Sequence, residues 1–80
     1  MKYPLYAIRD LKANGFTPPM LYVNEGVARR DFDYRLHNDQ SMGFSPNDYD
    51  LYEIGEYDSE TAQMIGKELP VLIVNGGQLF

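Results

Sequence analysis

The residues of this sequence that could carry chemistry are one histidine, a run of carboxylates, and a set of tyrosines and arginines. His37 is the single histidine, and the chain has no cysteine. Ser41, His37 and Asp39 offer the residue types of a hydrolytic triad, but closeness in sequence is not triad geometry. We expect His37 to act instead as a cation near a helix end, where it complements the helix dipole.

The carboxylates between residues 48 and 60 raise the question of a metal site. They lack the glycine-centred loop of an EF-hand, and strand alternation would place several of them on opposite faces. The Asn75-Gly76-Gly77 segment is too short for a phosphate-binding loop, since neither a GK[ST] motif nor a helix follows it. We therefore expect no catalytic residue, no metal and no cofactor, in a protein that is not an enzyme.

Aromatic residues are the strongest compositional signal, with seven tyrosines, four phenylalanines and no tryptophan. Exposed tyrosines beside arginines form stacking platforms for unpaired nucleic-acid bases, and each stacked base contributes about 1–3 kcal/mol. The alternative is that the rings line a small core, with their hydroxyls at its solvated rim. Under the first alternative, Tyr6 and Tyr22 are the stacking candidates.

Charge is distributed unevenly along the chain. The net charge of −5 and the pI near 4.5 argue against a protein that coats phosphate by bulk electrostatics. Residues 1–38 hold six Lys and Arg against four Asp and Glu, a net +2, whereas residues 39–80 hold one Lys against eight carboxylates, a net −7. Phosphate binding would need a local basic face from the first half, and its candidates are Arg9, Lys12, Arg29, Arg30 and Arg35.

Hydrophobic periodicity predicts the elements that must position these side chains. Alternating apolar residues predict a strand over residues 2–9, with Pro4 near its start. An Asn14-Gly15 turn and two prolines then lead into a short strand over residues 20–23. Asn24 is a good N-cap and predicts a helix over residues 25–37.

One face of that helix should bind the sheet, because Ala28, Phe32 and Leu36 form an i, i+4 apolar row. After a loop over residues 38–48, with one helical turn at 45–48, strands are predicted over residues 49–57 and 69–74. The latter is apolar on both faces and should be covered on both sides. We predict a single α+β domain over residues 1–80, β-β-α-β-β, with one helix on a mostly antiparallel sheet.

Self-association is a further expectation, because a chain of this size buries little surface and one helix covers only one face of a sheet. A homodimer is the simplest assembly, with interface candidates Val27, Tyr34, Val71 and Ile73. The rival account is that residues 38–48 and 78–80 fold over the last strand within one chain. The short apolar runs predict neither membrane insertion nor secretion.

Several strings in the chain resemble one known family. They are LYAIRD at 5–10, GFTPP at 15–19, SPNDY at 45–49, DYDLYEIGEYD at 48–58 and PVLIVNG at 70–76. Together they resemble the small nonstructural protein of gokushovirus-type microviruses, which are phages with circular single-stranded DNA genomes. The resemblance spans nearly the whole chain, and residues 51–58 are its most specific part.

This resemblance implies a non-virion protein that binds DNA, most simply single-stranded, in the cytoplasm of a bacterial host. It further implies a role in genome replication, at the switch from double-stranded synthesis to single-stranded genome production, with a host replication protein as a further candidate partner. The family offers no catalytic residues to carry over. The alternative is an acidic interaction module that mimics DNA and inhibits or recruits a host factor.

Overall fold

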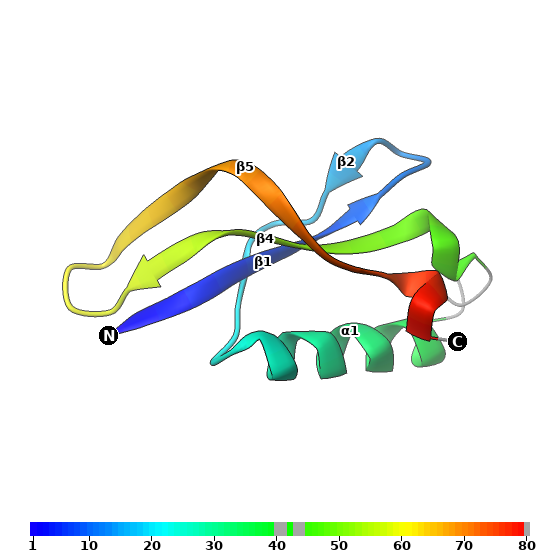
Figure 1. The fold of residues 1–80 in the computed structure, drawn as a ribbon, viewed down its shortest axis with the longest axis horizontal. Helices are drawn as coiled ribbons and strands as arrows, with labels where there is room; N and C mark the ends of the chain where they lie inside the picture. Colours follow the sequence, from blue (N-terminus) through cyan, green and yellow to red (C-terminus); the bar gives the residue numbers. More distant parts are fainter. Residues whose placement is uncertain (40–41, 43–44, 80) are drawn as a thin grey trace.

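The structure is a computed structural model that describes residues 1–39, 42 and 45–79. Its strands and helix follow the predicted order, with two short strands in place of the second (Figure 1). The elements are β1 (Lys2–Asp10), β2 (Gly15–Phe16), β3 (Met20–Leu21), α1 (Glu25–Asn38), β4 (Tyr49–Asp58) and β5 (Gln63–Asn75), with single 3-10 turns at Pro46–Asp48 and Gly76–Leu79.

The strands form one antiparallel sheet in the order β2-β1-β4-β5, and β3 also pairs with β1. Helix α1 lies along one face of this sheet (Figure 1). The predicted α+β fold with one helix on an antiparallel sheet is therefore confirmed. We call the sheet face beneath α1 the helix face and the opposite face the open face.

Helix α1 begins where the cap residue predicts. The Asn24 side chain accepts a hydrogen bond from the Val27 N–H at 2.9 Å, which satisfies one of the free donors of the first turn. At the other end the Asp39 N–H donates to the Arg35 carbonyl at 2.8 Å. His37 lies in the last turn of α1, at the predicted helix end.

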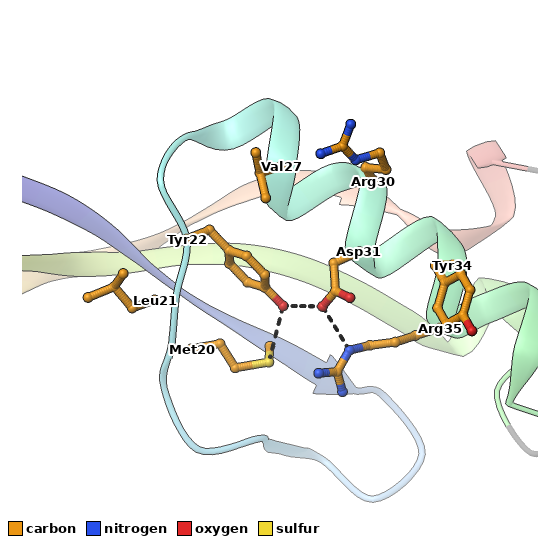
Figure 2. A pocket seen from close by; sticks show the side chains of 8 residues that line it. All are labelled: Met20, Leu21, Tyr22, Val27, Arg30, Asp31, Tyr34 and Arg35. Carbon is orange, nitrogen blue, oxygen red and sulfur yellow. Dashed lines mark hydrogen bonds and ion pairs between the residues drawn. The ribbon is translucent and has the colours of Figure 1, made fainter.

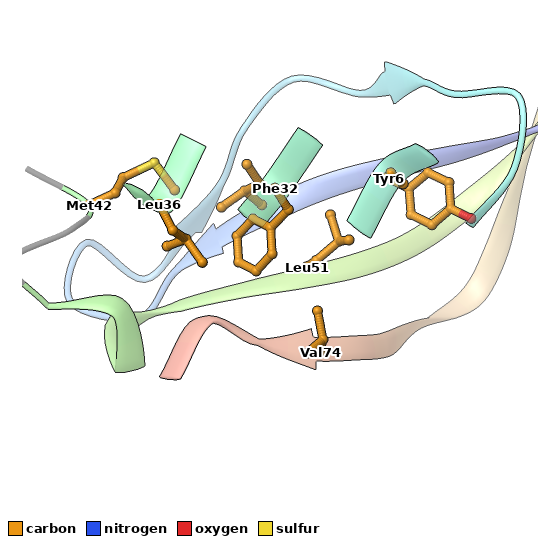
Figure 3. Packing of buried hydrophobic residues seen from close by; sticks show 8 residues of the cluster. Tyr6, Phe32, Leu36, Met42, Leu51 and Val74 are labelled. Atoms are coloured by element: carbon orange, nitrogen blue, oxygen red, sulfur yellow. The ribbon is translucent and has the colours of Figure 1, made fainter. Parts of the chain in front are cut away.

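The predicted row of Ala28, Phe32 and Leu36 is fully buried against the helix face. Its partners across the interface come from three strands and include Tyr6, Ile8, Leu51 and Val74 (Figure 3). These residues meet because the even-numbered side chains of β1 and their cross-strand partners share one face. The core thus connects the middle of the sheet to the whole length of α1.

The second predicted strand is shorter than expected. Asn14 takes a positive φ of 56° at the turn, as the Asn-Gly signal predicts. The chain then pairs with β1 only at β2 and β3, because Pro18 and Pro19 stand between them. Thr17 holds the first of these pieces to β1, since its Oγ1 accepts from the Ile8 N–H at 3.0 Å.

Strand β5 differs most from the prediction. It starts at Gln63, not residue 69, and it is the edge strand of the sheet. The expected cover on both sides is wrong, since Leu69 is 76% exposed and Val74 is the residue of this strand that is buried in the core. The reason is length: β4 and β5 continue as a hairpin past the N-terminal end of α1 (Figure 1).

Register shifts in the ladders decide which side chains share a face. Strand β4 carries an extra residue at Ile54, because Glu53 lies opposite Tyr6 and Gly55 lies opposite Leu5. Alternation therefore resets, and Tyr57 comes to lie opposite Tyr3 on the open face. Strict alternation along the predicted strand over residues 49–57 would have placed Tyr57 on the same face as Leu51, and the extra residue moves it to the other face.

Gly55 permits a close approach of the two long strands, so we predict that it tolerates no side chain. A Cβ there would collide with the Ile65 carbonyl oxygen of β5, whereas a Cβ on the opposite Gly66 would meet open space. Gly55→Ala should lower the free energy of unfolding by about 1–3 kcal/mol in urea titrations. Gly66→Ala is the matched control and should leave the free energy of unfolding nearly unchanged. Equal losses of stability in both variants would contradict the close approach of the two strands at Gly55.

Phe32 joins α1 to the sheet, so its truncation should remove the main contact between the two layers. Phe32→Ala should cost about 3–5 kcal/mol, a large part of the stability of so small a domain. Circular dichroism melts should then show a largely unfolded chain. Tyr34→Ala, on the exposed side of the same helix, should melt near the wild-type temperature, and a wild-type melt of Phe32→Ala would remove Phe32 from the core.

Candidate nucleic-acid interface

The structure separates the five basic candidates into three places. Consecutive helical residues point about 100° apart, so Arg29 and Arg30 lie on different flanks of α1. Arg29 lies towards β5, where its Nη2 donates to the Ile73 carbonyl at 3.3 Å. Arg30 and Arg35 lie on the flank next to β3. Arg9 and Lys12 belong to the hairpin between β1 and β2.

A groove of about 590 Å³ runs between α1 and the segment that contains β3 (Figure 2). It brings two arginines and two tyrosines together with apolar side chains. Tyr34 is 65% exposed and follows Arg30 by four residues, so both project from neighbouring turns of the same helix. The lining residues are Met20, Leu21, Tyr22, Val27, Arg30, Asp31, Tyr34 and Arg35.

A chain of hydrogen bonds holds the two sides of the groove together. The Tyr22 hydroxyl donates to Asp31 Oδ2, and the same oxygen accepts from Arg35 Nε at 3.0 Å (Figure 2). Burial, helped by the bond to Asp31, raises the pKa of Tyr22 to about 12. The Tyr22 hydrogen bond, together with Arg35, lowers the pKa of Asp31. Tyr22 is therefore a protonated, oriented donor that ties β3 to α1.

Arg30 is the cation of this groove that remains available to a ligand. Arg35 is already paired with Asp31, and on the other flank Arg29 pairs with Glu25 at 3.2 Å. Arg30 is exposed and has no ion-pair partner in the described part of the chain. A phosphate would therefore meet an uncompensated guanidinium at Arg30 and a partly neutralised one at Arg35.

Tyr6 is not a stacking ring, and that prediction is wrong. Its side chain is 1% exposed, because it lies beneath α1 and touches the Tyr22 ring edge-on at 5.8 Å. Burial raises its pKa to about 12. The exposed tyrosine of the groove is Tyr34, which the sequence analysis placed among the candidates for an oligomer interface. Its i, i+4 spacing from Arg30, off the core row, is the signal that would have found it.

The four interface candidates do not form one surface. Val27 and Tyr34 line the groove beside β3, whereas Val71 and Ile73 belong to β5 at the opposite edge of the sheet. Ile73 packs partly against the core, and Val71 is exposed. Helix α1 lies between the two pairs, so no single contact of a second copy joins all four.

The charge asymmetry of the sequence is partly cancelled in space. Lys2 pairs with Glu56 at 3.6 Å and Lys12 with Asp48 at 3.2 Å, so cations of the first half reach carboxylates of the second. Lys67 pairs with Glu53 at 3.0 Å. Within the described ranges no three potential ligands cluster as a metal site would require. Ser41, the serine of the triad considered above, lies outside the described residues.

Comparison with known proteins assigns the chain to a family. The model of the Phage ORF5 protein family matches residues 3–79, nearly the full length. The chain therefore belongs to this family and is a bacteriophage protein. No curated protein and no solved structure matches it. Across the residues that the structure describes, no helix is long and apolar enough to cross a membrane.

Removing the Tyr22 hydroxyl tests the bond across the groove. Tyr22→Phe should lower the free energy of unfolding by about 0.5–1.5 kcal/mol at neutral pH, and Asp31 should titrate closer to its ordinary pKa in carbon-detected NMR. Because the folded-state pKa of Asp31 is lowered, its carboxylate stabilises the fold above the ordinary pKa, and that contribution is lost as pH falls through the folded value.

The acid-induced loss of stability should accordingly be smaller in Tyr22→Phe than in the wild type. Tyr34→Phe removes a hydroxyl from an exposed ring of the same groove and should change neither the stability nor the Asp31 titration. An unchanged Asp31 titration in Tyr22→Phe would contradict the bond.

Proposed function

We propose that this phage protein binds single-stranded DNA, without enzymatic activity, through the groove between α1 and β3. The observation that carries the proposal is the exposed pair of Arg30 and Tyr34, one helical turn apart, beside Tyr22 and Arg35. An unpaired strand presents phosphates and bases in alternation, and this pair offers a cation for the first and a ring for the second.

The acidic net charge is compatible with this proposal because the groove is locally basic. It contains two guanidiniums and one carboxylate, and that carboxylate is already engaged by Tyr22 and Arg35. At physiological ionic strength charges farther away than about 8 Å are largely screened. Binding should be modest in affinity and should involve few phosphate contacts, so its salt dependence should be shallow.

The resemblance noted in the sequence supports a place for this activity in the phage cycle. The resemblance to the small nonstructural protein of gokushovirus-type microviruses supports a role in genome replication in the host cytoplasm, at the switch to single-stranded genome synthesis. A protein that holds the displaced strand would favour that switch. A homo-oligomer, most simply a dimer, would present two grooves and raise the effective affinity for one strand.

Charge reversal at neighbouring helix positions tests the groove. Arg30→Glu should weaken binding of a labelled oligothymidylate, measured by fluorescence anisotropy, and should flatten the dependence on salt by about 0.7 in the logarithmic slope, since one phosphate contact is lost. Arg29→Glu makes the same charge change on the other flank of α1 and is the matched control. It should bind nearly as the wild type does.

Two results would contradict the proposal. Equal losses of oligothymidylate affinity in Arg29→Glu and Arg30→Glu would mean that binding depends only on the net charge of the protein. No binding by the wild type at low salt would favour the acidic interaction module, which acts on a host protein. Circular dichroism should stay native in both variants, since neither arginine belongs to the buried row.

A further inference from the structure

The open face of the sheet carries a set of aromatic side chains that the groove does not use. The ladder places Tyr3 opposite Tyr57, Ala7 opposite Tyr52, and Arg9 opposite Phe16. These positions alternate with Tyr6 and Ile8 of the helix face, so they lie on the other side of the sheet. No described helix covers this side (Figure 1).

Three of these side chains form one connected cluster. The Phe16 and Tyr52 rings meet edge to face, with centroids 5.5 Å apart and planes at 73°. The Arg9 guanidinium lies over the Phe16 ring, 5.7 Å from its centroid, and its Nη2 donates to Asn14 Oδ1 at 3.0 Å. Phe16 is 47% exposed. The cluster is thus held in place from β1, β2 and β4 and is open to solvent.

The same register removes carboxylates from this face. Glu53, Glu56 and Asp58 of β4 lie opposite Tyr6, Pro4 and Lys2, which places all three carboxylates on the helix side of the ladder. Among the paired positions of the described strands, Asp50 is the one carboxylate on the open face. It is 7% exposed, and its Oδ1 accepts from Asn75 Nδ2 at 2.7 Å. At its paired positions the open face therefore carries rings and a cation, and its one paired carboxylate, Asp50, is held by Asn75. The exposed Glu68 of β5 alternates onto the same side as Gly66, at the far edge of the sheet.

We propose that the open face is a second contact surface for single-stranded DNA, on which Phe16 and Tyr52 stack unpaired bases and Arg9 contacts the adjoining phosphate. This inference rests on the proposed function and adds a site that the groove does not contain. Bases suit the face because rings stack on them without regard to sequence, while Arg9 has no ion-pair partner in the described part of the chain.

A second copy of the chain fits this face less well. A two-fold contact would bring the same patch onto itself. Arg9 would then meet Arg9 or aromatic rings of the other copy, and the carboxylate directly opposite Arg9 in the ladder, Asp50, is already held by Asn75. Unpaired nucleic acid supplies both the flat apolar surface and the negative charge that the cluster lacks.

The two surfaces are connected around the β2 edge of the sheet. Arg35 lines the groove and also a second hollow of about 440 Å³, which lies beneath the hairpin between β1 and β2. Phe16 lines that same hollow, and its ring contacts Tyr52 on the open face. A strand that leaves the groove at Arg35 can therefore reach Phe16 without crossing the acidic hairpin of β4 and β5.

The test compares an oligothymidylate with an abasic oligonucleotide of equal length, because the second keeps the phosphates but has no bases to stack. Tyr52→Leu and Phe16→Leu should each weaken oligothymidylate binding about 5- to 150-fold, the range for one lost stacking contact. Neither should change binding of the abasic strand. Tyr52→Phe keeps the ring and should bind as the wild type does.

A crosslinking measurement on the unaltered protein avoids any effect of the substitutions on folding. An oligonucleotide that carries 5-iodouracil should, on irradiation, attach to the peptides that contain Phe16 or Tyr52, as mass spectrometry would show. Crosslinks confined to the peptide that contains Tyr34 would overturn the inference and leave the groove in place.

The remaining outcomes separate this inference from the proposed function. Wild-type affinity in Tyr52→Leu, with weaker binding in Arg30→Glu, would overturn the open-face site alone. Failure of the wild type to bind either oligonucleotide would overturn both. Loss of an oligomer in Tyr52→Leu, seen by light scattering with no change in DNA binding, would make the face a protein interface and overturn the inference.

Discussion

The packing of one helix against one face of the sheet is the constraint on which the rest of the structure depends. Phe32 and Leu36 are buried against Ile8, Leu51 and Val74, in the core cluster that joins α1 to β1, β4 and β5. Because α1 must turn this row inwards, Arg30 and Tyr34 are held on one flank and Arg29 on the other. Among the described residues, no helix lies on the opposite side of the sheet (Figure 1).

Strand register is the second constraint, and it decides on which face of the sheet each charged side chain of β4 lies. A single extra residue at Ile54 shifts the alternation of β4, so that Glu56 joins Glu53 on the helix side and Tyr57 moves to the open face. Gly55 allows β5 to approach closely just beyond this shift. Glu53, Glu56 and Asp58 are thereby separated from Tyr52 and Tyr57 of the same strand.

The two surfaces that we propose for an unpaired strand lie on different sides of this acidic bacteriophage protein. The groove offers Arg30 and Tyr34, and the open face offers Phe16, Tyr52 and Arg9. Neither depends on a high net positive charge, because stacking contributes free energy that salt does not screen. The hydrogen bond of Tyr22 to Asp31 joins the segment that contains β3 to α1 across the groove.

The sequence by itself determined those features that neighbouring residues control. The i, i+4 row, the Asn24 cap and the Asn14-Gly15 turn each express a local preference, so the bounds of α1, the core row and the first turn were predicted correctly. The strings that resemble a phage family predicted a phage protein, and the family match over residues 3–79 confirms that prediction.

Only the tertiary structure decided which tyrosines are exposed and which cations share a surface. Tyr6 and Tyr34 are chemically identical, yet one lies beneath α1 and the other outside it, because the helix sits on the even-numbered side of β1. Arg29 and Arg30 are adjacent in sequence but separated by the turn of the helix. The start of β5 depends on its pairing with the far half of β4, and the face of Tyr57 depends on a bulge between β1 and β4. No local pattern encodes such a pairing.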